Sequence, residues 1–166
     1  MITNALLDHA ALVPLGLLAV AAGCVLLGWV ALRSRRLTGA LLGASLLPVV
    51  ALTLVPAAAS RVDDVRCTVQ FALPTLGSVE LLANVALFLP LAFSGTLLTR
   101  RPLRVLAAAA GASATIEALQ ALVPLLGRAC DTNDWLMNTT GAAVGAALAA
   151  GVLTLASRRP RDRAPA

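Results

Sequence analysis

Seven polar residues in the second half of this sequence could bind a ligand or carry out a reaction. The set comprises three acids, one arginine and three amides: Asn84, Glu117, Gln120, Arg128, Asp131, Asp134 and Asn138. An arginine can hold a phosphate or a carboxylate through two parallel hydrogen bonds. Glu117 could act as a general acid or base, and Asp131 and Asp134 could hold Mg²⁺ or Ca²⁺ through oxygen ligands. The single histidine, His9, lies outside this set, so no Ser-His or Cys-His pair is indicated.

The composition of the chain restricts the setting in which these side chains act. Of its 166 residues, 59% are hydrophobic and only 13% are charged, whereas about a quarter of the residues in an ordinary soluble domain are charged. This excludes a soluble enzyme, a disordered chain and a coiled coil. Aromatic residues make up 3% of the chain, too few for the aromatic girdles of a membrane β-barrel. A small helical membrane protein remains.

Runs of apolar residues identify the elements that must position the polar set. A helix needs about 20 mostly apolar residues to cross a hydrocarbon core of roughly 30 Å. Five such runs occur, and the fourth contains a single charge, that of Glu117; they are residues 10–32, 37–60, 81–99, 105–127 and 135–157. We therefore predict an all-α polytopic membrane bundle with five transmembrane helices. The first run has no basic residue before it, so we interpret it as a retained helix and not as a signal peptide.

These runs divide the chain into three parts. Residues 1–78 hold two helices and an outer loop, and residues 79–157 hold three helices together with the seven polar residues. Residues 158–166 form a basic, proline-containing tail that is expected to be disordered.

The arginines are divided unequally between the two ends of the predicted helices. Three lie on one side, at positions 61, 66 and 128. Ten follow the first, third and fifth helices, namely Arg33, Arg35, Arg36, Arg100, Arg101, Arg104, Arg158, Arg159, Arg161 and Arg163. The positive-inside rule then predicts that the N-terminus lies outside and the C-terminus in the cytoplasm. The net charge of +5 thus reflects topology, and no nucleic-acid partner is expected.

The acids gather on the side that this topology makes the outer one. Seven of the eight fall there or in the outer half of a helix: Asp8, Asp63, Asp64, Glu80, Glu117, Asp131 and Asp134. Pro124 lacks a backbone donor and is expected to kink or end the fourth helix. Glu117 then lies inside the membrane, where an unpartnered carboxylate is costly. Its expected partners are Gln120, Asn138, Asn84 and Arg128.

Several of these residues also have a structural interpretation. Asn84, Gln120 and Asn138 could join helices through hydrogen bonds without any further function. One of residues 131–134 is expected to cap the start of the fifth helix. Gly141 and Gly145 have the small-xxx-small spacing that lets a second helix approach closely, and we expect this partner to be the fourth or the first helix.

The three cysteines divide between a helix and the outer loops. Cys24 lies in the first helix and is expected to behave as a small apolar residue. Cys67 and Cys130 both lie in outer loops, where disulfides persist, so we predict a Cys67–Cys130 bridge. Two free thiols are the alternative.

The sequence resembles the VanZ-like family of bacterial membrane proteins over residues 80 to about 153. The resemblance rests on two segments, ELLANVALFLPLAF (80–93) and IEALQALVPLLGRACDTNDWLMNTTGAAVG (116–145). The family takes its name from a protein associated with teicoplanin resistance, and its members are thought to act at the cell envelope, with no reaction firmly attached to them. The resemblance thus implies a multi-pass protein of the bacterial plasma membrane. It carries over the seven polar residues as functional ones, without assigned roles.

Three hypotheses follow for the function. The first is an envelope accessory protein that binds a lipid-linked or cell-wall component at the outer leaflet through Arg128 and the amides, and that contributes to glycopeptide resistance. The second is a membrane enzyme with Glu117 as acid or base and a divalent cation on Asp131 and Asp134; outside this hypothesis no cofactor or metal is expected. The third is a structural or assembly protein in which the polar residues hold helices in register. The lipid bilayer is the expected surrounding, and the sequence leaves the ligand and the oligomeric state open.

Overall fold

A computed structural model of the protein describes residues 12–56, 67–72 and 78–158. Within these residues it contains five α-helices, each long and apolar enough to cross a membrane. They are α2 (Val13–Ala31), α3 (Arg35–Leu54), α4 (Val79–Thr99), α5 (Pro102–Leu122) and α6 (Thr132–Arg158). The predicted fold class, a bundle of five apolar helices, is thereby confirmed. Arg158, the first residue of the predicted tail (158–166), is the last residue of α6 and is not disordered; the rest of the tail, His9 and the loop acids Asp63 and Asp64 lie outside the described residues.

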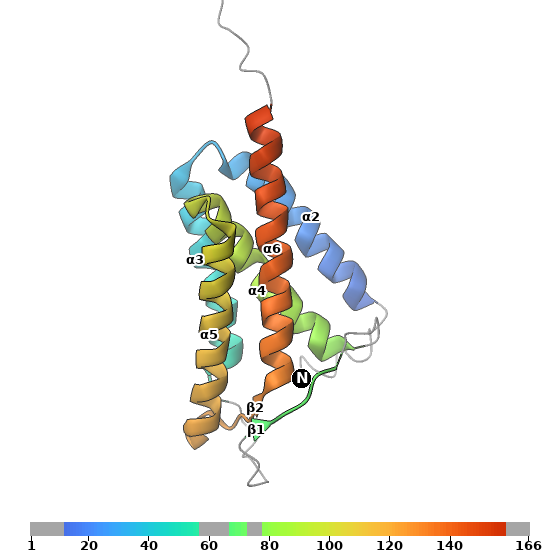
Figure 1. Cartoon of the computed structure of the whole chain (residues 1–166), viewed down its shortest axis with the longest axis vertical. Coiled ribbons are helices and arrows are strands. Elements are labelled where there is room, and N and C mark those ends of the chain that lie inside the picture. Colours follow the sequence, from blue (N-terminus) through green and yellow to red (C-terminus); the bar gives the residue numbers. More distant parts are fainter. Residues whose placement is uncertain (1–11, 57–66, 73–77, 159–166) are drawn as a thin grey trace, which may run out of the picture.

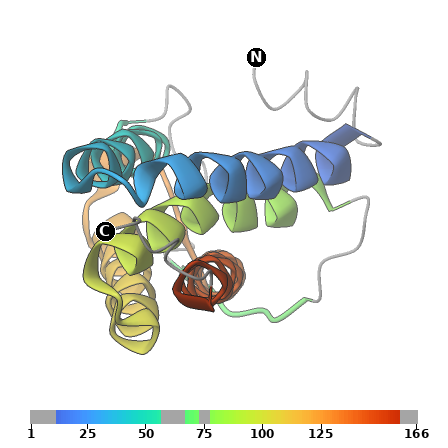
Figure 2. The same ribbon diagram turned by 90° about the horizontal axis from the view of Figure 1, so that it is seen from above.

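Helix α4 occupies the centre of the bundle. It contacts α2, α3, α5 and α6, and it is the most buried of the five described helices. Figure 2 shows α2 (blue) and α4 (green) lying side by side, with α6 (red) seen nearly end-on beside α4. The core around α4 is built from large apolar side chains such as Phe88, Leu89 and Phe93, each no more than 2% exposed. Side chains from α4 therefore meet side chains from every other described helix.

Close contact between α4 and α6 depends on two glycines. A Cβ added at Gly141 would overlap the backbone carbonyl of Val85, and one at Gly145 would overlap that of Leu89. Only glycine allows two helix backbones to approach this closely. The small-xxx-small motif therefore works as expected, but against the third predicted span. The expected partner, the fourth or first span, was wrong, because the motif shows which face packs closely and carries no information about the neighbour.

The end of α5 agrees with the expectation for Pro124. The helix ends at Leu122, and a short 3₁₀ turn η2 follows at Pro124–Leu126. Gly127 then adopts a left-handed conformation with φ of 63°, which suits a residue without a Cβ. The chain leaves α5 here and turns toward the start of α6.

Two short strands close the same end of the bundle. β1 (Cys67–Thr68) pairs in parallel with β2 (Cys130–Asp131), with Cys67 opposite Cys130. Figure 1 shows these strands at the bottom of the molecule, where α6 begins and α5 ends. The four acids that the structure describes lie toward this end, which we call the disulfide end. Of the eight described arginines, seven lie toward the opposite end, and Arg128 is the exception.

Candidate functional site

Six of the seven predicted polar residues surround one cavity, here called the polar cavity. Its volume is about 110 Å³. The lining comes from α3 to α6 and from the segment after α5: Leu52, Thr53, Ala83, Asn84, Leu87, Glu117, Gln120, Arg128, Asp134 and Asn138. Arg128 is the one cationic side chain in this lining. Residues up to 86 positions apart in the sequence, Leu52 and Asn138, thus meet around a space the size of one small polar group.

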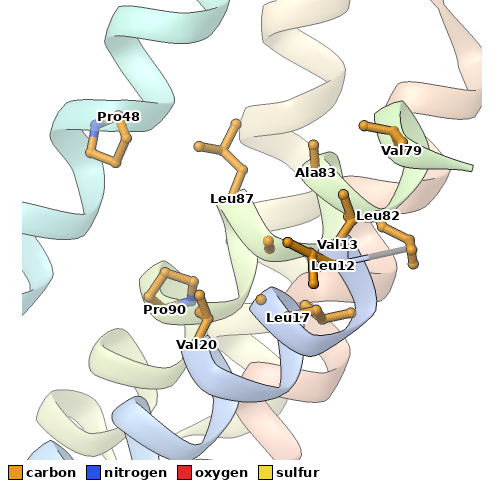
Figure 3. A pocket seen from close by; sticks show the side chains of 12 residues that line it. Leu12, Val13, Leu17, Val20, Pro48, Val79, Leu82, Ala83, Leu87 and Pro90 are labelled. Atoms are coloured by element: carbon orange, nitrogen blue, oxygen red, sulfur yellow. The ribbon is translucent and has the colours of Figure 1, made fainter. Parts of the chain in front are cut away.

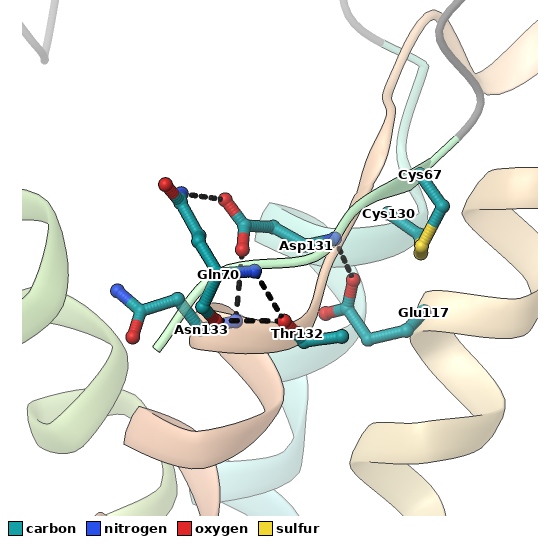
Figure 4. The surroundings of a disulfide bond; sticks show 7 residues. All are labelled: Cys67, Gln70, Glu117, Cys130, Asp131, Thr132 and Asn133. Atoms are coloured by element: carbon teal, nitrogen blue, oxygen red, sulfur yellow. Dashed lines mark hydrogen bonds between the residues drawn. A yellow bond between two sulfur atoms is a disulfide. The ribbon is translucent and has the colours of Figure 1, made fainter. Parts of the chain in front are cut away.

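Glu117 is held in the cavity wall by a backbone donor. Its side chain is 8% exposed, and Oε2 accepts a hydrogen bond of 2.8 Å from the N–H of Asp131 (Figure 4). A buried carboxylate needs such a partner, because burial without one is costly. The backbone bond therefore ties the inner part of α5 to the start of α6.

Asp134 links α6 to α4. Its Oδ1 accepts a hydrogen bond from Nδ2 of Asn84 at 2.5 Å. Arg128 lines the same cavity as this carboxylate. Asp134 and Asn84 thus join α6 to α4 at the cavity wall to which Arg128 also contributes.

Two further amides connect pairs of helices beside the cavity. Gln120 on α5 donates to the backbone carbonyl of Thr53 on α3 at 3.0 Å. Asn138 on α6 donates through Nδ2 to Oγ of Ser113 on α5, also at 3.0 Å. The carbonyl oxygen of Asn138 has no hydrogen-bond partner among the described residues, although the side chain is only 2% exposed. Because buried polar atoms are nearly always hydrogen-bonded, this oxygen marks a place for a donor from a bound group or a water.

Asp131, the seventh predicted residue, does not line the cavity. Its Oδ1 accepts from the N–H of Asn133 at 2.8 Å, and its Oδ2 accepts from Nε2 of Gln70 at 2.6 Å. The bond to Asn133 is that of a helix N-cap, so the expected cap of the fifth helix is Asp131. The carboxylate of Asp131 therefore stabilises the start of α6, and the backbone N–H of the same residue donates to Glu117.

The segment after β1, residues 69–72, is here called the strap, and it binds the start of α6 (Figure 4). The N–H of Gln70 donates to Oγ1 of Thr132, and that hydroxyl donates to the carbonyl of Gln70. Further along, the N–H of Ala72 donates to Oδ1 of Asn133. Cys67 and Cys130, the pair expected to form a bridge, are joined as a disulfide with 4.4 Å between their Cα atoms. The strap thus runs across the start of α6.

The donor set does not suit a divalent cation. Calcium takes six or more oxygen ligands, and magnesium is usually held by one or two carboxylates together with waters. Both carboxylate oxygens of Asp131 already accept hydrogen bonds from the protein. In the described part of the chain no three His, Cys, Asp or Glu side chains come together as metal ligands. These residues therefore do not support the divalent cation of the enzymatic hypothesis.

Sequence reasoning missed the partners of the polar residues. Glu117 is bound by a backbone N–H, Gln120 by a backbone carbonyl of α3, and Asn138 by Ser113. Backbone groups carry no sequence signal, and a serine in an alanine-rich helix gives little. The contribution of α3 to the cavity could not be inferred either, since the resemblance rested on the later helices.

The fold and the site together define a class of protein: a small polytopic helical membrane protein with a buried polar cavity near one end of its bundle. Residues 24–154 match the family described as VanZ/LLP1. The match covers most of the chain, so the protein belongs to this family. The match also includes residues 24–31 of α2 and all of α3, which precede the segments that carry the sequence resemblance (80–93 and 116–145). Searches among curated proteins and among solved structures found no match.

Proposed function

We propose that this protein is an accessory protein of the bacterial cell envelope that binds a lipid-linked or cell-wall component at the outer leaflet of the plasma membrane. The polar cavity is the observation that carries the proposal. Its 110 Å³ equals the volume of about three or four water molecules. A cavity of this size suits one compact polar group, such as a phosphate or a carboxylate.

The chemistry of the lining supports an anionic group with a neighbouring donor. Arg128 supplies the positive charge and a planar fork that matches phosphate and carboxylate oxygens. Asp134 and Glu117 line the same cavity as this guanidinium, and Oδ1 of Asn138, a buried acceptor, would take a hydrogen bond from a hydroxyl or an amide beside the anion. Phosphorylated sugars and peptides of cell-wall components carry both kinds of group.

The outer location of the cavity is part of the proposal. Two features support it, the Cys67–Cys130 disulfide beside the cavity and the concentration of arginines at the other end. Disulfides persist outside the cytoplasm, and arginines favour the cytoplasmic side. On the family resemblance we extend the proposal to a contribution to glycopeptide resistance of the teicoplanin type.

The experiment compares two arginine variants in a host whose glycopeptide susceptibility depends on the protein. Arg128→Gln removes the charge at the cavity, whereas Arg36→Gln removes an exposed charge at the opposite end. At equal expression we expect Arg128→Gln to lose resistance and to lose the ligand that co-purifies in native mass spectrometry. Arg36→Gln should keep both. Retention of both by Arg128→Gln would overturn the proposal.

An enzymatic function is the second candidate, favoured by the position of Glu117. Its carboxyl lines the cavity and could exchange a proton with a group bound there. A structural function is the third candidate. It is favoured by three hydrogen bonds that amide side chains donate between helices, joining α4 to α6, α5 to α3 and α6 to α5. An Arg128→Gln variant that folds normally but no longer binds would argue against the structural function.

A further inference from the structure

A long apolar groove lies beside the polar cavity. It has a volume of about 440 Å³ and is formed by α2 and α4, with Pro48 of α3 at its edge. Figure 3 shows Leu17 and Val20 of α2 on one side and Leu82, Leu87 and Pro90 of α4 on the other. All the side chains that line it are apolar. The groove therefore offers no hydrogen bond to a ligand and suits a hydrocarbon.

The groove and the polar cavity share a wall. Ala83 and Leu87 line both spaces, and they lie four residues apart, on one face of α4. Asn84, which binds Asp134 in the cavity, is the neighbour of Ala83. A molecule lying in the groove is thus separated from the polar cavity only by the small side chain of Ala83 and the flexible side chain of Leu87.

The length and direction of the groove match one leaflet of a bilayer. Along α4 its lining extends from Val79 to Pro90, which is about 16 Å at about 1.5 Å per residue. Half of a hydrocarbon core of roughly 30 Å has the same length. Val79 is the first residue of α4, at the disulfide end, and Pro90 lies near the middle of the helix. The groove therefore runs from the disulfide end of α4 to the middle of the helix, over a length that matches one lipid chain.

The two spaces require different parts of one molecule. The polar cavity is too small for a hydrocarbon chain of this length, and the groove offers no partner to a charged group. We infer that the ligand is a lipid with a phosphate head, whose hydrocarbon chain lies in the apolar groove while the phosphate enters the polar cavity. This inference rests on the proposed function, and among the components proposed there it selects the lipid-linked kind.

Two glycines of α2 provide a matched pair of variants. Gly16 lines the groove, and an added Cβ there would meet open space. Gly23 also has open space around an added Cβ, lies two turns further along the same face, and is not part of the groove. Gly16→Phe therefore adds a ring at the groove from a position whose Cβ meets open space, and Gly23→Phe adds the same ring elsewhere on the same helix.

The test measures binding of two probes to detergent-purified protein by native mass spectrometry. One probe is phosphatidic acid with sixteen-carbon chains, and the other is glycerol 3-phosphate, which has the phosphate without chains. We expect Gly16→Phe to weaken phosphatidic acid binding about tenfold, the effect of losing about two buried methylenes. Its binding of glycerol 3-phosphate should equal that of the wild type. Gly23→Phe should bind both probes normally, and Arg128→Gln should weaken both.

The outcomes separate the inference from the proposed function. Equal binding of phosphatidic acid by the two glycine variants, with a loss in Arg128→Gln, overturns the groove and leaves the proposed function standing. Normal binding of both probes by Arg128→Gln overturns the proposed function, and this inference with it. A dimer mass in the wild type that Gly16→Phe abolishes would show that the groove receives a second copy of the chain, which also overturns the inference.

Discussion

Asn84 on α4 donates its side-chain amide to the carboxylate of Asp134 on α6, with 2.5 Å between Nδ2 and Oδ1. The two residues are 50 positions apart in the sequence, and both line the polar cavity. They belong to the two helices whose backbones meet at Gly141 and Gly145. Because Arg128 lines the same cavity, Asp134 joins the close contact between α4 and α6 to the cavity wall that carries the cation.

Replacing Asn84 by leucine should destabilise the protein. The variant has a similar volume but leaves the partly buried Asp134 without this donor, which costs about 1–3 kcal/mol. The measurement is the free energy of unfolding in detergent micelles, with Arg104→Gln, an exposed change on α5 at the opposite end of the bundle, as control. In Asp134→Asn the effect of Asn84→Leu should shrink. An undiminished effect would mean that the bond between these side chains is not its cause.

The spans of this fold could be predicted because the thickness of a bilayer fixes their length. Apolar runs, of which only the fourth contains a charge, located all five described helices, and Pro124 located the end of α5. The site could be anticipated in part, because polar residues are so rare in these helices that Asn84, Glu117 and Asn138 stood out. Their convergence around one cavity with Gln120, Arg128 and Asp134 then followed from helix packing.

The remaining features of the site depend on contacts that sequence does not encode locally. Gln70 lies 61 residues before Asp131, and nothing in its neighbourhood indicates that it binds that carboxylate. The outcome for Asp131 shows the same limit: its spacing from Asp134 suggested a shared ligand, but its side chain caps α6 and its backbone binds Glu117. The predicted orientation in the membrane stays a prediction.

The disulfide should contribute strongly to stability. Cys67 and Cys130 are 63 residues apart, and closing a loop of this length is worth about 4 kcal/mol in the entropic model. We expect Cys67→Ser with Cys130→Ser to lower the unfolding free energy by an amount of this order and to loosen the strap on α6. Alkylation without reductant should leave both cysteines of the wild type unmodified. Modification of both would contradict the bridge.

Replacing a glycine of α6 by alanine should lower stability at Gly145 but not at Gly151. In Gly145→Ala the Cβ overlaps the Leu89 carbonyl of α4, so a backbone must move, and we expect a loss of about 1–3 kcal/mol or more. Gly151→Ala places its Cβ in open space on the same helix and should leave stability unchanged or slightly raised. Unfolding of both variants in detergent checks this pair. Equal stabilities would show that α4 and α6 are further apart than described.

Two exposed residues at opposite ends of α5 test the proposed orientation. Leu125, just after the helix at the disulfide end, is 86% exposed, and Leu103 at its start is 79% exposed. In a Cys24→Ser background that keeps the disulfide, a membrane-impermeant maleimide should label Leu125→Cys in intact cells and leave Leu103→Cys unlabelled. The reverse labelling would place the polar cavity toward the cytoplasm and contradict the proposed role at the outer leaflet.

Replacing Glu117 by glutamine separates binding from catalysis. Glutamine keeps an oxygen that can accept from the N–H of Asp131, whereas Glu117→Leu leaves that donor without an acceptor, at a cost of about 1–3 kcal/mol. We therefore expect Glu117→Gln to unfold like the wild type and Glu117→Leu to be less stable. If the protein only binds its ligand, Glu117→Gln should retain both the co-purified ligand and glycopeptide resistance, because Arg128 still supplies the charge. Retained ligand with lost resistance would instead favour the enzymatic candidate, since the bond to Asp131 requires only an acceptor while proton transfer requires the carboxyl group.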